Sequence, residues 1–145
     1  MEDILKKLRI VALEARNFSY APYSGYTVGA ALLCENGRIV TGSNIENASY
    51  GATVCAERTA FFKAVSENEK SFVAIAIAGG VKDEDPEDFA YPCGVCRQVM
   101  REFCDEESFR VFVVRSEDEY EEYLLKDLLP KSFGPNNLQN TSKNQ

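Results

Sequence analysis

Residues 72–80 read FVAIAIAGG, an unbroken apolar run that ends in two glycines. A short apolar run of this kind is typical of a strand that is buried on both faces, and we expect this strand over residues 72–78, ending at the two glycines. Helix-type patterns flank it over residues 54–65 and 93–104, and Pro92 stands where the second of these helices would begin. A second buried strand is expected over residues 109–114. The order strand, helix, strand predicts a parallel pair with helices packed on the sheet.

The chain on either side of this unit supplies the remaining elements. Upstream, the runs 28–34 and 38–41 flank Asn36-Gly37, a strong hairpin signal. Apolar residues at helical spacing predict an amphipathic helix over residues 4–15. Downstream, residues 120–129 are expected to form an edge strand and a short helix that ends before Pro130.

These elements together predict an α/β fold. We expect a three-layer α/β/α sandwich with a mixed sheet of about five strands. One domain would span residues 1–135, and the polar residues 136–145 would form a frayed, disordered tail.

Composition excludes several functional classes. The 145 residues include 16 Lys plus Arg and 23 Asp plus Glu, for a formal net charge of −7, and no histidine. An acidic chain without a basic cluster disfavours nucleic acid as a partner. The absence of histidine excludes Ser-His-Asp triads, histidine bases and every histidine-containing metal site. Any zinc must therefore be held by cysteine or carboxylate.

The chain shows no membrane or secretion signal. No segment reaches the ~18 apolar residues that span a bilayer, and the first eight residues include Glu2 and Asp3 where a signal peptide is positive. A cytoplasmic, reducing location is expected. In such a location the pair Cys93 and Cys96 indicates metal or redox chemistry before it indicates a disulfide.

Two motifs place cysteines at predicted helix starts. One is Thr53-Val54-Cys55-Ala56-Glu57-Arg58, and the other is Tyr91-Pro92-Cys93-Gly94-Val95-Cys96-Arg97-Gln98. A helix N-terminus lowers the pKa of a thiol, and thiolate is the form that binds metal. In a doubly covered sheet two strand-to-helix turns can lie side by side. Cys55, Cys93 and Cys96 would then converge and leave the fourth tetrahedral position of a zinc ion open for water.

Glu57 and Arg58, which follow Cys55 in the first motif, have chemistry of their own. Glu57 lies two positions after Cys55, so its carboxylate can reach a water on the metal without being a ligand, and can move its proton. Three thiolates leave a zinc site with net negative charge, which makes the bound water a poorer acid. Arg58 is placed to donate hydrogen bonds to the sulfurs and offset that charge.

The chain resembles cytidine deaminases of the small, homotetrameric, zinc-dependent type. The two motifs match the zinc-deaminase pattern, and further segments match in the same order over about residues 1–138. The other matching segments are residues 21–24 (APYS), 28–32 (VGAAL), 42–51 (GSNIENASYG), 55–60 (CAERTA) and 128–133 (LLPKSF).

The resemblance implies an activity and a cofactor. It implies hydrolytic deamination of cytidine and deoxycytidine to uridine and deoxyuridine with release of ammonia, a step of pyrimidine salvage. One Zn²⁺ per subunit would be held by Cys55, Cys93 and Cys96, with Glu57 as the proton shuttle and Arg58 beside the sulfurs. The partners would be a small nucleoside and further copies of the chain in a tetramer.

The resemblance also implies the substrate-binding residues. Phe18 would stack on the pyrimidine, Asn44 and Glu46 would bind the ribose hydroxyls, and Tyr50 and Phe133 would reach a neighbouring subunit's site. Ala56 belongs to the same substrate-binding set. From the residues alone other interpretations stay open: a core aromatic for Phe18, a turn for Asn44 and Glu46, and interface packing for Tyr50 and Phe133.

Three alternatives to this function remain. A deaminase of another aminopyrimidine nucleoside, such as blasticidin S, shares a three-cysteine site, although residues 44–50 favour cytidine. A structural zinc module needs a fourth protein ligand, whereas Cys34 and Cys104 lie in core-like runs. A thiol redox protein would leave Cys55 and Glu57 unexplained.

A carboxylate at Glu46 would also repel a 5′-phosphate, which favours a free nucleoside as the substrate.

Overall fold

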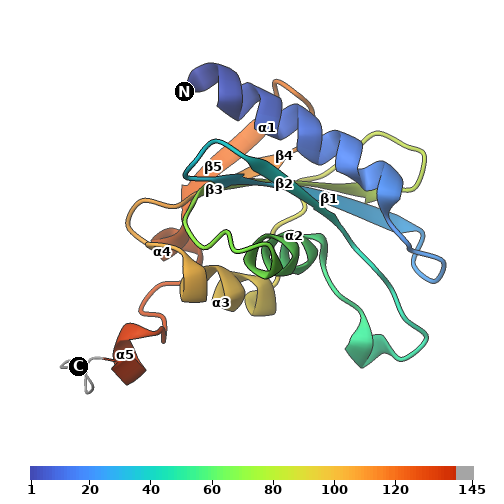
Figure 1. Cartoon of the computed structure of the whole chain (residues 1–145). Helices are drawn as coiled ribbons and strands as arrows, with labels where there is room; N and C mark the ends of the chain where they lie inside the picture. The colour runs from blue at the N-terminus through green and yellow to red at the C-terminus, as the bar shows by residue number, and fades with distance from the viewer. Residues whose placement is uncertain (140–145) are drawn as a thin grey trace.

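The structure is a computed structural model that describes residues 1–139, and its centre is one mixed five-stranded sheet in the order β2-β1-β3-β4-β5 (Figure 1). The neighbours β3 and β4 are parallel, and the other neighbouring pairs are antiparallel. The prediction of a mixed sheet of about five strands is confirmed. The strands are β1 (Tyr26–Cys34), β2 (Ile39–Ser43), β3 (Phe72–Val81), β4 (Arg110–Val114) and β5 (Tyr120–Leu124).

Helices cover both faces of the sheet, as the three-layer prediction required. In Figure 1, α1 crosses one face, and α2 and α3 lie on the other. Short helices complete the described chain. The helices are α1 (Glu2–Ala15), η1 (Arg16–Phe18), η2 (Tyr50–Ala52), α2 (Ala56–Ser66), α3 (Gly94–Phe103), α4 (Leu125–Leu128) and α5 (Asn136–Gln139).

Successive side chains of the central strands fill two separate cores, because they point alternately to opposite faces. Ala74 and Ala76 of β3 pack with Leu5 and Leu8 of α1. Ile75 and Ile77 of β3 belong to the other core, with α2 and α3. Phe61 of α2 is fully buried there. Helix α2 is therefore anchored on the sheet by a large aromatic side chain.

The two glycines of the central run do not end the strand. We expected β3 to stop at Ala78, but it continues through Gly79 and Gly80 to Val81, paired with β1. A Cβ on Gly79 would lie 2.8 Å from the Ala90 Cβ, and one on Gly80 would lie 2.9 Å from Arg16 Nη2. These glycines therefore allow close packing against the strand and do not form a turn.

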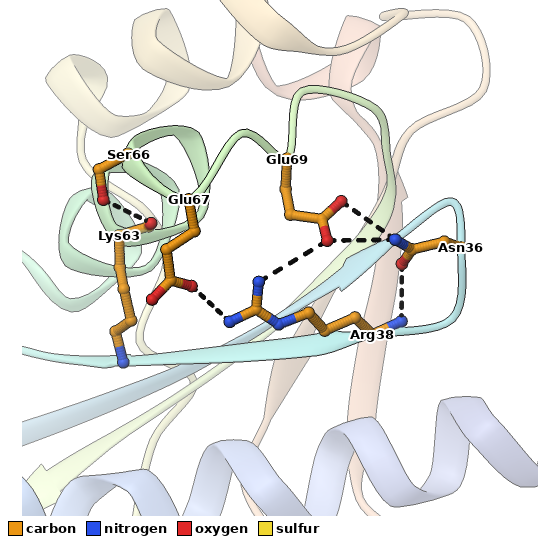
Figure 2. Close-up of polar contacts among 6 residues, drawn as sticks. All are labelled: Asn36, Arg38, Lys63, Ser66, Glu67 and Glu69. Carbon is orange, nitrogen blue, oxygen red and sulfur yellow. Dashed lines mark hydrogen bonds and ion pairs between the residues drawn. The ribbon is translucent and has the colours of Figure 1, made fainter.

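A polar network ties the β1–β2 turn to the C-terminal end of α2 (Figure 2). Arg38 pairs with Glu67 and, at 3.6 Å, with Glu69. The Asn36 side-chain amide donates to Glu69 at 3.1 and 3.2 Å, and its Oδ1 accepts from the Arg38 backbone N–H. The network holds the end of α2 that lies opposite its first residue, Ala56.

The chain end is partly described. Residues 136–139 of the expected tail form α5, and the rest of that tail, residues 140–145, lies outside the described residues. Within residues 1–139 there is no helix with both the length and the apolar character needed to cross a membrane.

Candidate active site

Three cysteine thiols from two helix starts meet at one point. Cys55, Cys93 and Cys96 have their sulfur atoms within 4.8 Å of one another, and the Cys55 and Cys93 sulfurs are 3.8 Å apart. All five cysteines of the chain are free thiols, so no disulfide competes for these sulfurs. The convergence that the two motifs predicted is present in the structure.

Local backbone geometry explains why the thiols point together. Cys55 is the N-cap of α2 and Cys93 is the N-cap of α3. The Cys93 sulfur accepts a hydrogen bond from the Cys96 backbone N–H at 3.4 Å, as an N-cap side chain does. The start of α3 thus directs a backbone N–H at the Cys93 sulfur, whereas the Cys55 side chain accepts no capping bond from α2. Both cysteines lie at the positive end of a helix dipole, which stabilises thiolates.

The geometry and chemistry of these donors fit a zinc ion. Zinc–sulfur bonds of about 2.3 Å in a tetrahedral site place neighbouring sulfurs about 3.8 Å apart. The separation of the Cys55 and Cys93 sulfurs is 3.8 Å. Among residues 1–139 the cluster has no fourth cysteine or carboxylate, and three soft thiolates match a site that keeps one position for a water or substrate. Cys55, Cys93 and Cys96 are therefore positioned to hold a zinc ion.

Arg58 lies against these sulfurs. Its Nη2 donates a hydrogen bond to the Cys55 sulfur at 3.4 Å, and its Nε is buried without a hydrogen-bond partner in the described part of the chain. Contact with the Cys96 thiol, followed by the hydrogen bond from Arg58, lowers the pKa of Cys55. The Cys55 sulfur in turn raises the pKa of the Arg58 guanidinium. This charge arrangement favours a thiolate beside a permanent cation.

Glu57 carries the buried carboxylate of the site. It lies in the first turn of α2 and only 4% of its surface is exposed. Its pKa is raised to about 7, mainly by burial and also by the neighbouring Cys55, against the opposing effects of a backbone hydrogen bond and of Arg58. A carboxyl group with a pKa near neutrality can both accept and donate a proton, as a general acid–base requires.

A cavity of about 220 Å³ opens beside the thiols and Glu57. Asn44 lies on its wall, and its side-chain amide is held by β1, with Oδ1 accepting from the Val28 N–H and Nδ2 donating to the Tyr26 carbonyl, both at 2.9 Å. The cavity thus joins two of the three clustered cysteines, Cys55 and Cys93, with one acid–base group and one fixed amide. Its lining consists of Tyr26, Val28, Asn44, Thr53, Val54, Cys55, Ala56, Glu57, Ile77, Ala90, Tyr91 and Cys93.

Comparison with known proteins agrees with this geometry. Residues 2–112 match the model of the cytidine and deoxycytidylate deaminase zinc-binding region. The chain belongs to this deaminase family. A cytidine deaminase of Halalkalibacterium halodurans is 47% identical over 122 residues, which cover 84% of this chain and 88% of that protein. One of Sporosarcina psychrophila is 46% identical over 134 residues, or 92% and 94% of the two chains.

A solved structure of the deaminase family has the same architecture. The crystal structure of cytidine deaminase from Burkholderia pseudomallei superposes with a TM-score of 0.79 at 40% sequence identity. The alignment covers 88% of this chain and 97% of that chain. The matched zinc-binding region includes all three clustered cysteines and Glu57.

Two of the substrate-binding residues expected for a deaminase lie in a neighbouring hollow. Glu46 and Tyr50 line it together with Tyr23, and Thr53 lines both this hollow and the cavity. The Glu46 carboxylate accepts from the backbone N–H groups of Tyr23 and Ser24 and from the Ser24 hydroxyl, which most strongly lowers its pKa. The hollow therefore adjoins the cavity at Thr53.

Two other expected residues are outside both spaces. Phe18, at the end of η1, is 79% exposed and does not line the cavity. Phe133 is 58% exposed and lines a separate hollow with Gln98 and residues near the chain end. The single chain thus brings together the cysteines, Ala56, Glu57, Arg58 and Asn44, but not these two aromatic side chains.

Tyr91 is a wall residue that sequence reasoning did not select. It lines the cavity two residues before Cys93, and its hydroxyl donates to Glu121 at 2.6 Å. That hydrogen bond raises the pKa of Tyr91 to about 12 and lowers the pKa of Glu121. Its position directly before Pro92 and Cys93 is the signal that could have marked it.

Proposed function

We propose that this protein hydrolyses cytidine and deoxycytidine to uridine and deoxyuridine with release of ammonia, a reaction of pyrimidine salvage. The observation that carries the proposal is the cluster of three thiols, with the Cys55 and Cys93 sulfurs 3.8 Å apart, beside a cavity that Cys55, Cys93 and the buried Glu57 line. Family membership gives independent support.

The cofactor and the ligands follow from the donor set. Cys55, Cys93 and Cys96 would hold one Zn²⁺ per chain, and Arg58 would stabilise the thiolates through its hydrogen bond to Cys55. A zinc ion held there supplies a water molecule of lowered pKa as the nucleophile. Free thiols are required for this role, which favours a cytoplasmic, reducing location.

Glu57 would carry the protons of the reaction. With water as the co-substrate, its carboxylate accepts a proton from the attacking water and delivers it to N3 of the pyrimidine. It then accepts the proton of the hydroxyl group added at C4 and delivers it to the exocyclic amine, so that the C4 carbonyl forms as the C4–N bond breaks and ammonia leaves. Burial supports this role because it raises the pKa of Glu57 to about 7 and so makes both transfers accessible.

The remaining assignments concern the nucleoside. Asn44 and Glu46 would bind the ribose hydroxyls, and Ala56 would contact the base beside Glu57. The support is that Asn44 and Ala56 line the cavity while Glu46 lines the adjoining hollow.

Phe18, Tyr50 and Phe133 would complete the site in an oligomer. We propose a homotetramer in which Phe18 stacks on the base and Tyr50 and Phe133 reach a neighbouring subunit. Large exposed fractions support an assembly, since 79% of Phe18, 78% of Tyr50 and 58% of Phe133 are open in the single chain.

Turnover of cytidine tests the proposal directly. The purified protein is incubated with cytidine, the ultraviolet change to uridine is followed, and zinc is measured in the same sample. Glu57→Ala should retain zinc and lose turnover by at least ~10²-fold, because it removes the proton carrier and spares the sulfurs. A wild-type protein without zinc, or a fully active Glu57→Ala variant, would contradict the mechanism.

A further inference from the structure

A carboxylate of the edge strand holds a tyrosine of the cavity wall. Glu121 Oε1 accepts a hydrogen bond from the Tyr91 hydroxyl at 2.6 Å and one from the Tyr123 hydroxyl at 2.7 Å. The rings of Tyr91 and Tyr123 also meet edge to face, with centroids 6.3 Å apart. We call Tyr91, Glu121 and Tyr123 the tyrosine clamp.

The clamp joins two parts of the fold that the chain separates. Glu121 lies on β5, in register with Val113 of β4, so its position is fixed by the sheet. Tyr91 lies in the segment before α3 and lines the cavity beside Cys93. Thirty residues separate the two partners in sequence. The clamp therefore connects one wall of the cavity to the sheet.

The same segment is held on its other side by α3. Arg97 Nε donates to the Pro92 carbonyl at 2.7 Å, and Arg97 Nη1 donates to the Leu128 carbonyl at 2.7 Å. Proline also restricts the residue before it to extended conformations, which limits how Tyr91 can move. These bonds hold the backbone from Pro92 onward, so the Tyr91 side chain and the residues before it keep freedom to move, and the clamp restricts both.

The hydrogen bonds of the clamp are suited to fixing the orientation of the Tyr91 ring. A carboxylate only accepts hydrogen bonds, and phenol-to-carboxylate bonds are short and directional. Tyr91 is half exposed, so these bonds exchange for bonds to water with little net gain in folding free energy. What they provide is one defined orientation for a ring that lines the cavity.

We propose that Glu121 is a positioning residue of the active site, which acts by fixing the Tyr91 ring as a wall of the substrate cavity. The inference rests on the proposed deaminase function. Neither Glu121 nor Tyr123 lines the cavity, so their effect reaches the substrate through Tyr91. Loss of the clamp should therefore weaken nucleoside binding more than it slows the chemical step.

Kinetics of four variants test this inference. Glu121→Ala and Tyr91→Phe should each raise KM for cytidine by about three- to tenfold, the worth of one hydrogen bond, with kcat changed less than about twofold. Glu121→Gln keeps an oxygen that accepts from both hydroxyls, so it should restore KM to within about twofold of wild type. The double variant with Glu121→Ala and Tyr91→Phe should raise KM no more than Glu121→Ala alone, because both changes break the same Tyr91–Glu121 bond.

Glu122→Ala is the matched control. Glu122 is the next residue on β5, faces the other way and pairs with Arg110 at 2.6 Å, so its loss removes the same charge without touching the clamp. Its KM should stay at the wild-type value. An unchanged KM in Glu121→Ala, an equal rise in Glu122→Ala, or multiplied effects in the double variant would overturn the inference.

Hydrogen exchange supplies a test that does not depend on turnover. In the zinc-loaded protein, Glu121→Ala should speed amide exchange in a peptide covering residues 87–97, whereas Glu122→Ala should exchange like wild type. Unchanged exchange of this peptide in Glu121→Ala would overturn the inference. A wild-type protein that binds zinc and exchanges as described but does not convert cytidine would instead overturn the proposed function alone.

Discussion

Arg58 Nη2 donates a hydrogen bond to the sulfur of Cys55 at 3.4 Å, within the first turn of the helix that Cys55 caps. The bond places a permanent positive charge against a group of three thiols. Three thiolates carry more charge than a divalent ion neutralises, and electron density left on the sulfurs makes a zinc-bound water less acidic. Arg58 withdraws part of that density.

Arg58→Gln should therefore slow deamination without releasing the metal. We expect a fall in kcat of about tenfold, the lower end of the range for groups that support metal ligands, with one zinc retained per chain. Steady-state assays with cytidine and metal analysis provide the measurement. Arg110→Gln removes an arginine on β4 that pairs with Glu122, and this control should keep wild-type kcat. Equal kcat in wild type and Arg58→Gln would refute the charge argument.

Single cysteine replacements should separate metal ligands from core thiols. Alanine at Cys55, Cys93 or Cys96 should remove most of the bound zinc and the activity, because two thiols bind far more weakly than three. Cys34→Ala and Cys104→Ala should each keep one zinc, since both thiols belong to the core beneath α2 and α3. Zinc per chain is measured after dialysis against a weak chelator. Loss of zinc in Cys34→Ala or Cys104→Ala would contradict the assignment.

A 5′-phosphate should make a nucleoside a poor substrate. Glu57 and Glu46 bring carboxylates to the cavity and its adjoining hollow, and neither lining includes lysine or arginine among residues 1–139. We expect kcat/KM for deoxycytidine 5′-phosphate to be lower than for deoxycytidine by about 10²-fold or more, owing to repulsion between like charges. Both substrates are compared at low and high salt, and the difference between their kcat/KM values should be smaller at high salt. Equal values of kcat/KM would exclude this account.

The sequence predicted the fold well where a single segment carries the whole signal. The apolar run of β3 and the Asn36-Gly37 turn each specify their own structure, and both appear in the sheet. Gly79 and Gly80 led us to end the predicted strand too early, because glycine occurs both in turns and where chains pack closely. Only the approach of Ala90 and Arg16 to β3 distinguishes the two uses.

The site was predictable to the same extent. The cysteines and Glu57 lie in two short motifs at helix starts, so local rules place them. The partnership of Tyr91 with Glu121 depends on the register of β5 against β4, and no local pattern encodes that register. Phe18 and Phe133 stay exposed in one chain, so their roles depend on contacts with other chains.

Gly42→Ala should disturb the site by displacing α2 from the sheet. A Cβ on Gly42 would lie 2.3 Å from the Ala56 carbonyl oxygen and 2.5 Å from the Ala60 nitrogen, both backbone atoms of α2. The helix that carries Glu57 must then move off the sheet, at a cost of about 1–3 kcal/mol in unfolding free energy. Denaturant unfolding and zinc titration should both show weakening. Gly51→Ala, where no atom lies within 4 Å of the added Cβ, should change neither.

Phe61 and Phe62 offer a test of how α2 is anchored, because adjacent residues of one helix differ completely in burial. Phe61 is fully buried and its ring meets those of Phe72, Phe103 and Phe109, whereas Phe62 is 49% exposed. Phe61→Ala should lower the unfolding free energy by about 3–5 kcal/mol, from lost burial and the cavity that remains. Denaturant unfolding of the zinc-loaded protein measures the change.

Phe62→Ala removes the same atoms from a half-exposed position on the same helix, so it controls for helix propensity and composition. Its unfolding free energy should fall by less than half as much as that of Phe61→Ala, because most of the lost area already faces water in the single chain. If the Phe62 variant instead dissociates from an assembly at wild-type folding stability, its ring belongs to a contact between chains. Equal destabilisation of the two folded chains would contradict the anchoring of α2 by Phe61.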